Sequence, residues 1–97
     1  MCGLDPETVN KIKGACARIE TIDMVVLYGS RAKGNYHAGS DIDITLAGLN
    51  LTSVNAVYPL MKELDELYLP YTFDISIFNN IDNAGLRNHI EKGGKVF

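Results

Sequence analysis

The stretch LYGSRAKGNYHAGSDIDITL, Leu27 to Leu46, holds the features that decide the fold of this 97-residue chain. It overlaps the apolar run Met24–Tyr28, which Gly29 stops and which is typical of a strand buried on both faces. It closes with Ser40–Leu46, where polar and apolar residues alternate as in a strand with one polar face and one core face. A glycine-rich loop that carries basic residues therefore joins two predicted strands.

The rest of the chain alternates between helical and strand periods of hydrophobicity. The further elements predicted are a helix from the Asp5 cap to about Glu20, a helix over Ser53–Tyr68, a strand over Tyr71–Phe78 and a helix from about Asp82 to Lys92. The order α-β-(loop or short helix)-β-α-β-α predicts an α+β fold, a two-layer arrangement of a small sheet and helices.

Composition limits the classes of protein to consider. A chain of 97 residues suffices for one compact domain, so residues 1–97 are expected to form a single domain. The formal net charge of −3 argues against direct nucleic-acid binding through a basic surface. The sequence has no apolar run of about 18 residues and no secretory core, so we expect a cytoplasmic protein without membrane contact. Cys2 and Cys16 are expected to be plain thiols, because they show no metal-ligand spacing.

Two aspartates separated by one residue raise the question of a metal site. On a strand, Asp41 and Asp43 share one face with backbones about 6.6 Å apart, and Asp74 joins them if its strand pairs alongside. Two unit charges at that distance repel by about 2.5 kcal/mol at an effective dielectric of about 20, so a divalent cation is an economical compensation. Carboxylate oxygens suit Mg²⁺ or Mn²⁺. The sequence therefore predicts Asp41, Asp43 and Asp74 as metal ligands.

The turn before the aspartates has the composition of a phosphate-binding loop. Gly29 lets the backbone turn tightly, so that N–H groups and the Ser30 hydroxyl can face an anion. If the following residues open a short helix, its N-terminus adds positive potential, and Arg31 and Lys33 add formal charge. Mg²⁺ held by a few carboxylates commonly also binds substrate phosphates. The loop and the aspartates together predict a metal–phosphate site.

Each of these features alone also has an ordinary structural explanation. A Gly-Ser turn is usually only a turn, and an Asp-x-Asp on an exposed strand face is usually only solvated. His37 and His89 are expected to be solvent-exposed rather than catalytic, and Tyr36 is the one tyrosine placed to stack on a base. The joint pattern of strand, Gly-Ser, ten residues, Asp-x-Asp on a strand and a later strand with one aspartate favours a functional site.

The residues YGSRAKG and SDIDI resemble the signature of nucleotidyltransferases of the DNA polymerase β superfamily, in particular the small minimal nucleotidyltransferases. The resemblance covers Val25 to about Phe78, and the ending LRNHIEKGGKVF is similar too. It implies the nucleotidyltransferase fold with a small mixed β-sheet, and Mg²⁺-dependent (or Mn²⁺-dependent) transfer of a nucleoside monophosphate from ATP by a two-metal mechanism. The nucleotide and phosphate contacts implied are Gly29, Ser30, Arg31, Lys33 and Ser40; the catalytic carboxylates implied are the metal ligands Asp41 and Asp43, and Asp74 as the base or a second-metal ligand.

The sequence departs from the family pattern at Lys33, where arginine is more usual. An ammonium holds phosphate less well than a planar guanidinium, so a lower nucleotide affinity is expected. Family members that act on antibiotics, RNA or DNA carry an additional domain for the acceptor, for which 97 residues leave no room. The acceptor is therefore expected to be held by a partner or by a second copy of the chain.

Antitoxin members of the resembled family pair with a neighbour-encoded helical HEPN-domain toxin, which implies AMP transfer from ATP to such a partner in a toxin–antitoxin pair. One alternative is a binding module that neutralises the helical partner, with nucleotide as a regulatory ligand only. Nucleotidylation of a small molecule of the aminoglycoside type fits poorly, because the acceptor wall is missing. An exposed apolar patch on Ser53–Tyr68 or at Val96-Phe97 is expected as the partner interface.

Overall fold

A four-stranded sheet lies at the centre of the computed structural model, which describes residues 3–37 and 39–97. The strands are β1 (Met24–Tyr28), β2 (Ile42–Ala47), β3 (Phe73–Ile77) and β4 (Lys95–Val96), in the order β3-β2-β1-β4. β1 pairs antiparallel with β2 and β4, whereas β2 and β3 are parallel. The sheet is mixed, and the predicted α+β architecture of a small mixed sheet and helices is confirmed.

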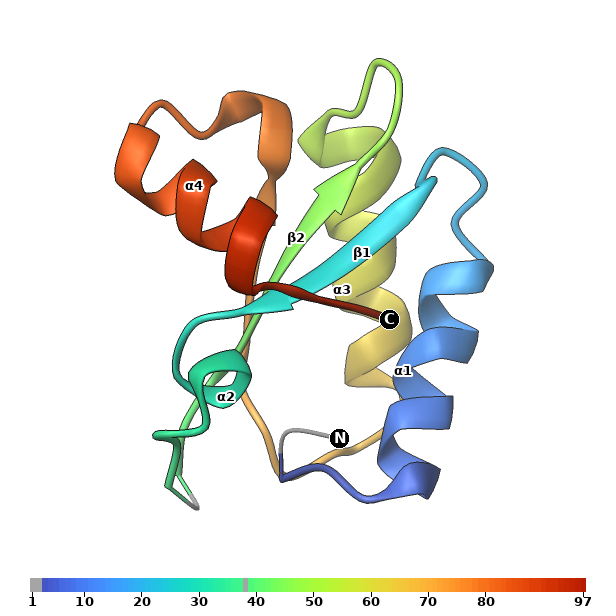
Figure 1. The fold of residues 1–97 in the computed structure, drawn as a ribbon. Helices are drawn as coiled ribbons and strands as arrows, with labels where there is room; N and C mark the ends of the chain where they lie inside the picture. Colours follow the sequence, from blue (N-terminus) through green and yellow to red (C-terminus); the bar gives the residue numbers. More distant parts are fainter. Residues whose placement is uncertain (1–2, 38) are drawn as a thin grey trace.

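Helices cover both faces of the sheet (Figure 1). They are α1 (Pro6–Ala17), α2 (Ser30–Lys33), α3 (Tyr58–Asp65) and α4 (Ala84–Gly93). α1 and α3 pack on one face, where the core includes the fully buried Ile12, Leu27, Ile44 and Leu60, and α4 lies over the other face. The described part of the chain contains no helix with the length and apolar character needed to cross a membrane.

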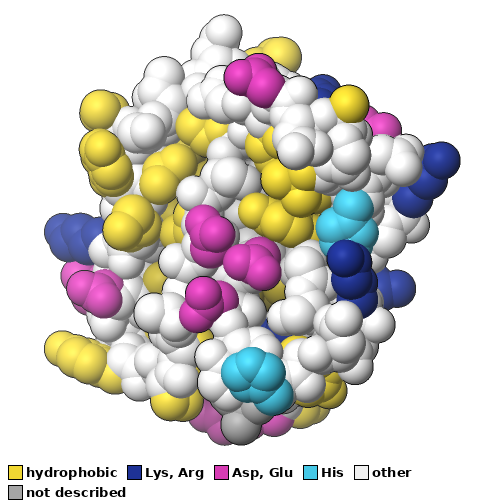
Figure 2. All heavy atoms as spheres, turned by 90° about the vertical axis from the view of Figure 1, so that its left-hand side faces the viewer, with side chains coloured by type: hydrophobic (Ala, Val, Ile, Leu, Met, Phe, Trp, Pro, Cys, Tyr) yellow, Lys and Arg dark blue, Asp and Glu magenta, His cyan; other side chains and the backbone are white. Residues whose placement is uncertain are grey.

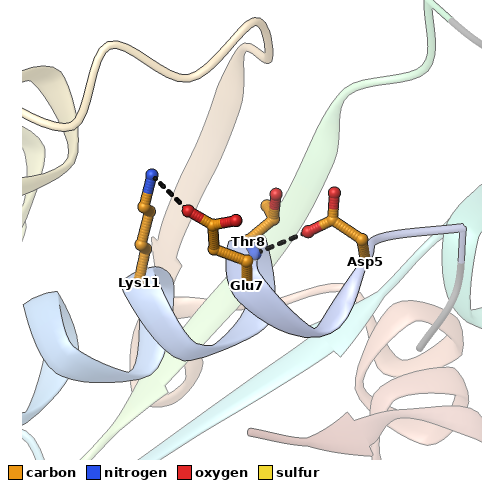
Figure 3. Close-up of polar contacts among 4 residues, drawn as sticks. All are labelled: Asp5, Glu7, Thr8 and Lys11. Carbon is orange, nitrogen blue, oxygen red and sulfur yellow. Dashed lines mark hydrogen bonds and ion pairs between the residues drawn. The ribbon is translucent and has the colours of Figure 1, made fainter.

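The start of α1 shows why the helix begins at Pro6 (Figure 3). Asp5 accepts a hydrogen bond from the Thr8 amide at 2.7 Å, and proline at the first helical position needs no hydrogen-bond acceptor. Glu7, in the first turn, and Lys11, one turn later, form an exposed i,i+4 ion pair at 3.3 Å. The predicted cap is therefore confirmed. The Cys2 prediction lies outside the described residues, and Cys16 is a free, buried thiol within α1.

Several element bounds differ from the predictions; β3 begins at Phe73 rather than Tyr71, and α4 begins at Ala84 rather than about Asp82. α1 ends at Ala17 rather than near Glu20, because the chain tightens into an i→i−3 hydrogen bond from the Arg18 amide to the Ala15 carbonyl. β2 begins at Ile42, which leaves Asp41 just outside the strand. The sequence predicts only an apolar end at Val96-Phe97, but Lys95–Val96 pairs with β1 as a fourth strand.

The predicted helix over Ser53–Tyr68 is divided into a π-helical turn over Ser53–Val57 and α3. Pro59 has no N–H to donate to the carbonyl of Asn55, which instead accepts a hydrogen bond from the Thr21 hydroxyl at 2.7 Å. The cap is Thr52, in a reciprocal capping box with Asn55. The proline thus explains why the segment is not one regular α-helix.

Candidate active site

The turn from β1 into α2 brings backbone directly against a carboxylate. Gly29 has φ 76° and ψ −152°, a region that side chains other than glycine rarely adopt. A methyl group on Gly29 would overlap the carboxylate of Asp43. Ser30 follows as the first residue of α2, and Lys33 ends α2 with an exposed side chain. Glycine is therefore needed at this position both for its conformation and for the close approach to Asp43.

A row of three residues crosses the sheet at the end next to the Gly29 turn. In the strand register, Tyr28 pairs with Asp43 and Asp43 pairs with Asp74, so their side chains project from the same face. Asp41 precedes β2, and its carboxylate accepts a hydrogen bond from the Thr72 hydroxyl at 2.6 Å. The structure therefore brings the predicted carboxylates to one end of the sheet, with Asp43 in the middle.

The electrostatics of this end of the sheet show that the other two carboxylates act on Asp43. Burial raises the pKa of Asp43 above its ordinary value, and the charges of Asp74 and Asp41 raise the pKa of Asp43 further. Burial likewise raises the pKa of Tyr28, opposed by its contact with Ser76 and assisted by Asp74 and Asp43. Figure 2, which looks onto the side that carries α2 and α4, shows acidic side chains gathered near the centre. A cation at this site would relieve the repulsion.

The fit of this site to a divalent metal rests on its donor set. Within residues 3–37 and 39–97, no group of three His, Cys, Asp or Glu side chains is close enough to hold a metal as it stands. Asp43 and Asp74 are adjacent, while Asp41 is turned to Thr72. Oxygen donors from a few carboxylates suit Mg²⁺, which keeps waters and takes further oxygens from substrate phosphates. The residues therefore fit a metal that arrives with a nucleotide.

Arg31 lies inside the protein rather than on the surface. Its side chain is 3% exposed, and its guanidinium carbon lies 5.2 Å from the Tyr36 ring centroid and 5.0 Å from that of Tyr71. One Nη donates to the carbonyl of Ser40 at 3.2 Å. In this conformation Arg31 joins α2 to the loop before Asp41, and its predicted contact with phosphate stays a prediction.

The loop before Asp41 is held by short polar contacts. The Ser40 hydroxyl accepts a hydrogen bond from the His37 amide at 2.8 Å, and His37 Nδ1 accepts one from the Gly39 amide. His37 is exposed, as the sequence predicts. Tyr36, expected to stack on a base, contacts the Arg31 guanidinium with its ring.

Sequence reasoning missed one residue that the fold brings to the site. His89, on α4, is half-buried, and its Nε2 accepts a hydrogen bond from the amide of Gly29 at 3.2 Å. Its ring meets the Tyr28 ring edge-on, with centroids 6.5 Å apart. The expectation that His89 is simply solvent-exposed is wrong. No local pattern marks it, because the contact joins residues 60 positions apart.

A model of the family described as polymerase beta, nucleotidyltransferase, matches residues 10–97. The chain belongs to this nucleotidyltransferase family. The resemblance of the sequence to nucleotidyltransferases of the DNA polymerase β superfamily is thereby confirmed, and the Gly29-Ser30 turn, Asp41, Asp43 and Asp74 lie within the matched residues. No curated protein matches the chain.

Solved structures share the fold of this nucleotidyltransferase. A toxin–antitoxin crystal structure with AMP-PNP aligns at a TM-score of 0.70 and 22% identity, covering 90% of this chain and 69% of the other. Two mutant forms of the toxin–antitoxin MntA-HpeT align at 0.68 and 0.65, with 23% and 18% identity. They cover 97% and 96% of this chain, and 72% and 71% of theirs. At these identities the likeness concerns the fold.

Proposed function

We propose that this nucleotidyltransferase transfers AMP from ATP to a hydroxyl group of a partner protein, with Mg²⁺ or Mn²⁺ held at Asp41, Asp43 and Asp74. The pairing of Asp43 with Asp74 next to the Gly29 turn is the observation that carries the proposal. When bound, Mg²⁺ would neutralise charge on the phosphate oxygens and on the attacking oxygen. ATP is the nucleotide we propose because one structure of similar fold was solved with AMP-PNP.

The proposed role of each residue follows from its position in the site. Gly29, Ser30 and Lys33 lie at the turn that would receive the triphosphate, and Arg31 and Ser40 support the loop that carries Asp41. Asp74 is exposed, so an acceptor hydroxyl can reach it and give up its proton. The hydroxyl oxygen would attack the α-phosphorus, the bond from that phosphorus to the bridging oxygen would break, and pyrophosphate would leave.

A helical HEPN-type protein from a neighbouring gene is the partner we propose, in a cytoplasmic hetero-oligomer. Structures of similar fold are toxin–antitoxin proteins, which supports a partner of this kind. The segment from Ser53 to Tyr68 exposes large apolar side chains, with Val54 75%, Tyr58 61%, Met61 51% and Tyr68 92% exposed. Val96 is 61% exposed on β4. Surfaces of this kind support docking of another protein.

The same apolar surface favours a second candidate function, a binding module that neutralises its partner by covering it. In that case nucleotide would be a regulatory ligand and no group would be transferred. The clustered carboxylates argue for the enzyme, because a binding module has no physical need for two carboxylates whose charges raise the pKa of Asp43 between them.

One experiment separates the two functions. The protein and its co-purified partner are incubated with Mg²⁺ and ATP labelled at the α-phosphate, and in parallel with ATP labelled at the γ-phosphate. The transferase predicts label on protein from the α-label only, and loss of that label with Asp43→Asn. If the partner and Mg²⁺–ATP both bind but no label moves to protein, the binding module replaces the enzyme.

A further inference from the structure

We infer that His89 is a positioning residue that fixes the Gly29 turn for phosphate binding; this inference rests on the proposed function. The observation is the hydrogen bond from the Gly29 amide to His89 Nε2 at 3.2 Å, which links the last helix to the loop between β1 and α2. His89 contacts the Gly29 amide and the Tyr28 ring rather than a carboxylate, so the residue acts through the backbone of Gly29.

A hydrogen bond and a ring contact orient the imidazole. An Nε2 that accepts a hydrogen bond carries no proton, so the neutral ring bears its hydrogen on Nδ1. The imidazole also meets the Tyr28 ring edge-on. A methyl group at Gly93 would lie 3.2 Å from Nδ1 and 3.4 Å from Cε1, a tight contact. Glycine at this position leaves room for the ring.

Gly29 needs such a restraint because glycine is the most mobile residue of the backbone. Its conformation at φ 76° and ψ −152° is one of several that glycine can adopt, yet this one brings the turn against the Asp43 carboxylate. It also sets the direction in which Ser30 enters α2. A turn that is already fixed before the nucleotide arrives loses less conformational entropy on binding, which raises affinity. His89 therefore contributes to nucleotide affinity without touching the nucleotide.

The hydrogen bond also refines the role of Gly29. The sequence predicts Gly29 as a phosphate contact through its backbone, but here its amide is donated to His89. The contribution of Gly29 is then its shape, and the anion is left to Ser30 and the basic residue Lys33. Replacing the acceptor should weaken nucleotide binding even though every predicted phosphate contact is still present.

The test compares His89→Leu, which removes the acceptor, with His89→Gln, which keeps one, and with Asn88→Leu, an exposed neighbour on α4, as the matched control. Without nucleotide, the Gly29 amide should exchange with solvent faster in His89→Leu than in the parent, His89→Gln or Asn88→Leu. With Mg²⁺–ATP, titration calorimetry should give a dissociation constant about 3- to 10-fold higher for His89→Leu, and within about twofold of the parent for the other two.

Several outcomes overturn the inference. An unchanged dissociation constant in His89→Leu, whether or not its melting temperature falls, means that the histidine is only structural. Tighter binding in His89→Leu means that His89 competes with phosphate for the Gly29 amide. Unchanged exchange of that amide means that the contact does not form. A parent that binds no Mg²⁺–ATP overturns the proposed function instead, and the amide exchange then decides the His89 contact by itself.

Discussion

Asp43→Asn is the change that most directly probes why the carboxylates are clustered. Asp43 lies between Tyr28 and Asp74 in the register, and burial and neighbouring charge both disfavour its ionised form. At the strand spacing of about 5 Å, two unit charges repel by about 3 kcal/mol at an effective dielectric of about 20. Because solvent screens this open site, replacing the Asp43 charge by a neutral amide should stabilise the metal-free protein by only about 1 kcal/mol. The metal-free variant should therefore be more stable than the parent, with a melting temperature about 4–8 °C higher.

Mg²⁺–ATP should reverse the order of stability of the parent and Asp43→Asn. Mg²⁺–ATP at ten times its dissociation constant should stabilise the parent by about 1.4 kcal/mol through linkage, and Asp43→Asn should lose most of that gain. The assay is a melting series of both proteins with and without Mg²⁺–ATP. Asp23→Asn, at an exposed aspartate just before β1, is the control and should behave as the parent. A destabilised metal-free Asp43→Asn with a full response to Mg²⁺–ATP would refute the reasoning.

Three further predictions concern the turn, the titration of Asp43 and the buried arginine. Gly29→Ala should lower the free energy of unfolding in urea more than Gly34→Ala does. Both glycines have positive φ, but only a methyl group on Gly29 would meet a carboxylate. The strained backbone of Gly29→Ala alone should account for about 1–3 kcal/mol. The pKa of Asp43 is raised, so the stability advantage of Asp43→Asn should be small below the ordinary value of 3.8 and grow as pH rises through the raised pKa; urea unfolding at a series of pH values measures it. Arg31→Lys should lower the free energy of unfolding by about 1–2 kcal/mol, because an ammonium cannot stack on both tyrosines and donate to the Ser40 carbonyl as the guanidinium does, and thermal melting checks this.

The alternation around Asp43 is the part of the fold that the sequence determines most firmly. Ile42, Ile44 and Leu46 are fully buried on the core face, so one face of β2 is fixed by hydrophobic burial alone. The polar face is less regular than the pattern suggests, because Thr45 is also fully buried and donates to the Ser76 carbonyl. Burial of the second face depends on where α4 packs, which no local period reveals.

Contacts between distant segments account for what the sequence does not reveal. The division of the Ser53–Tyr68 helix follows from Pro59 together with Thr21, a residue from a different loop. The hydrogen bond of His89 to Gly29 depends on the path of the chain after β3. The sequence predicts Arg31 as a phosphate contact, but it does not reveal that aromatic rings from two separate segments enclose the guanidinium. In each case the partner is set by tertiary packing rather than by spacing along the chain.

The central claim is that Asp41, Asp43 and Asp74 serve nucleotidyl transfer, and the intact mass of the acceptor tests it most directly. The protein is incubated with its helical partner, Mg²⁺ and ATP, and both chains are then weighed by mass spectrometry while pyrophosphate is measured. The proposed function predicts a gain of one nucleoside monophosphate on an acceptor chain, one pyrophosphate released per transfer, and neither with Asp43→Asn. A gain of phosphate alone, or no gain although the partner and Mg²⁺–ATP are bound, would contradict it.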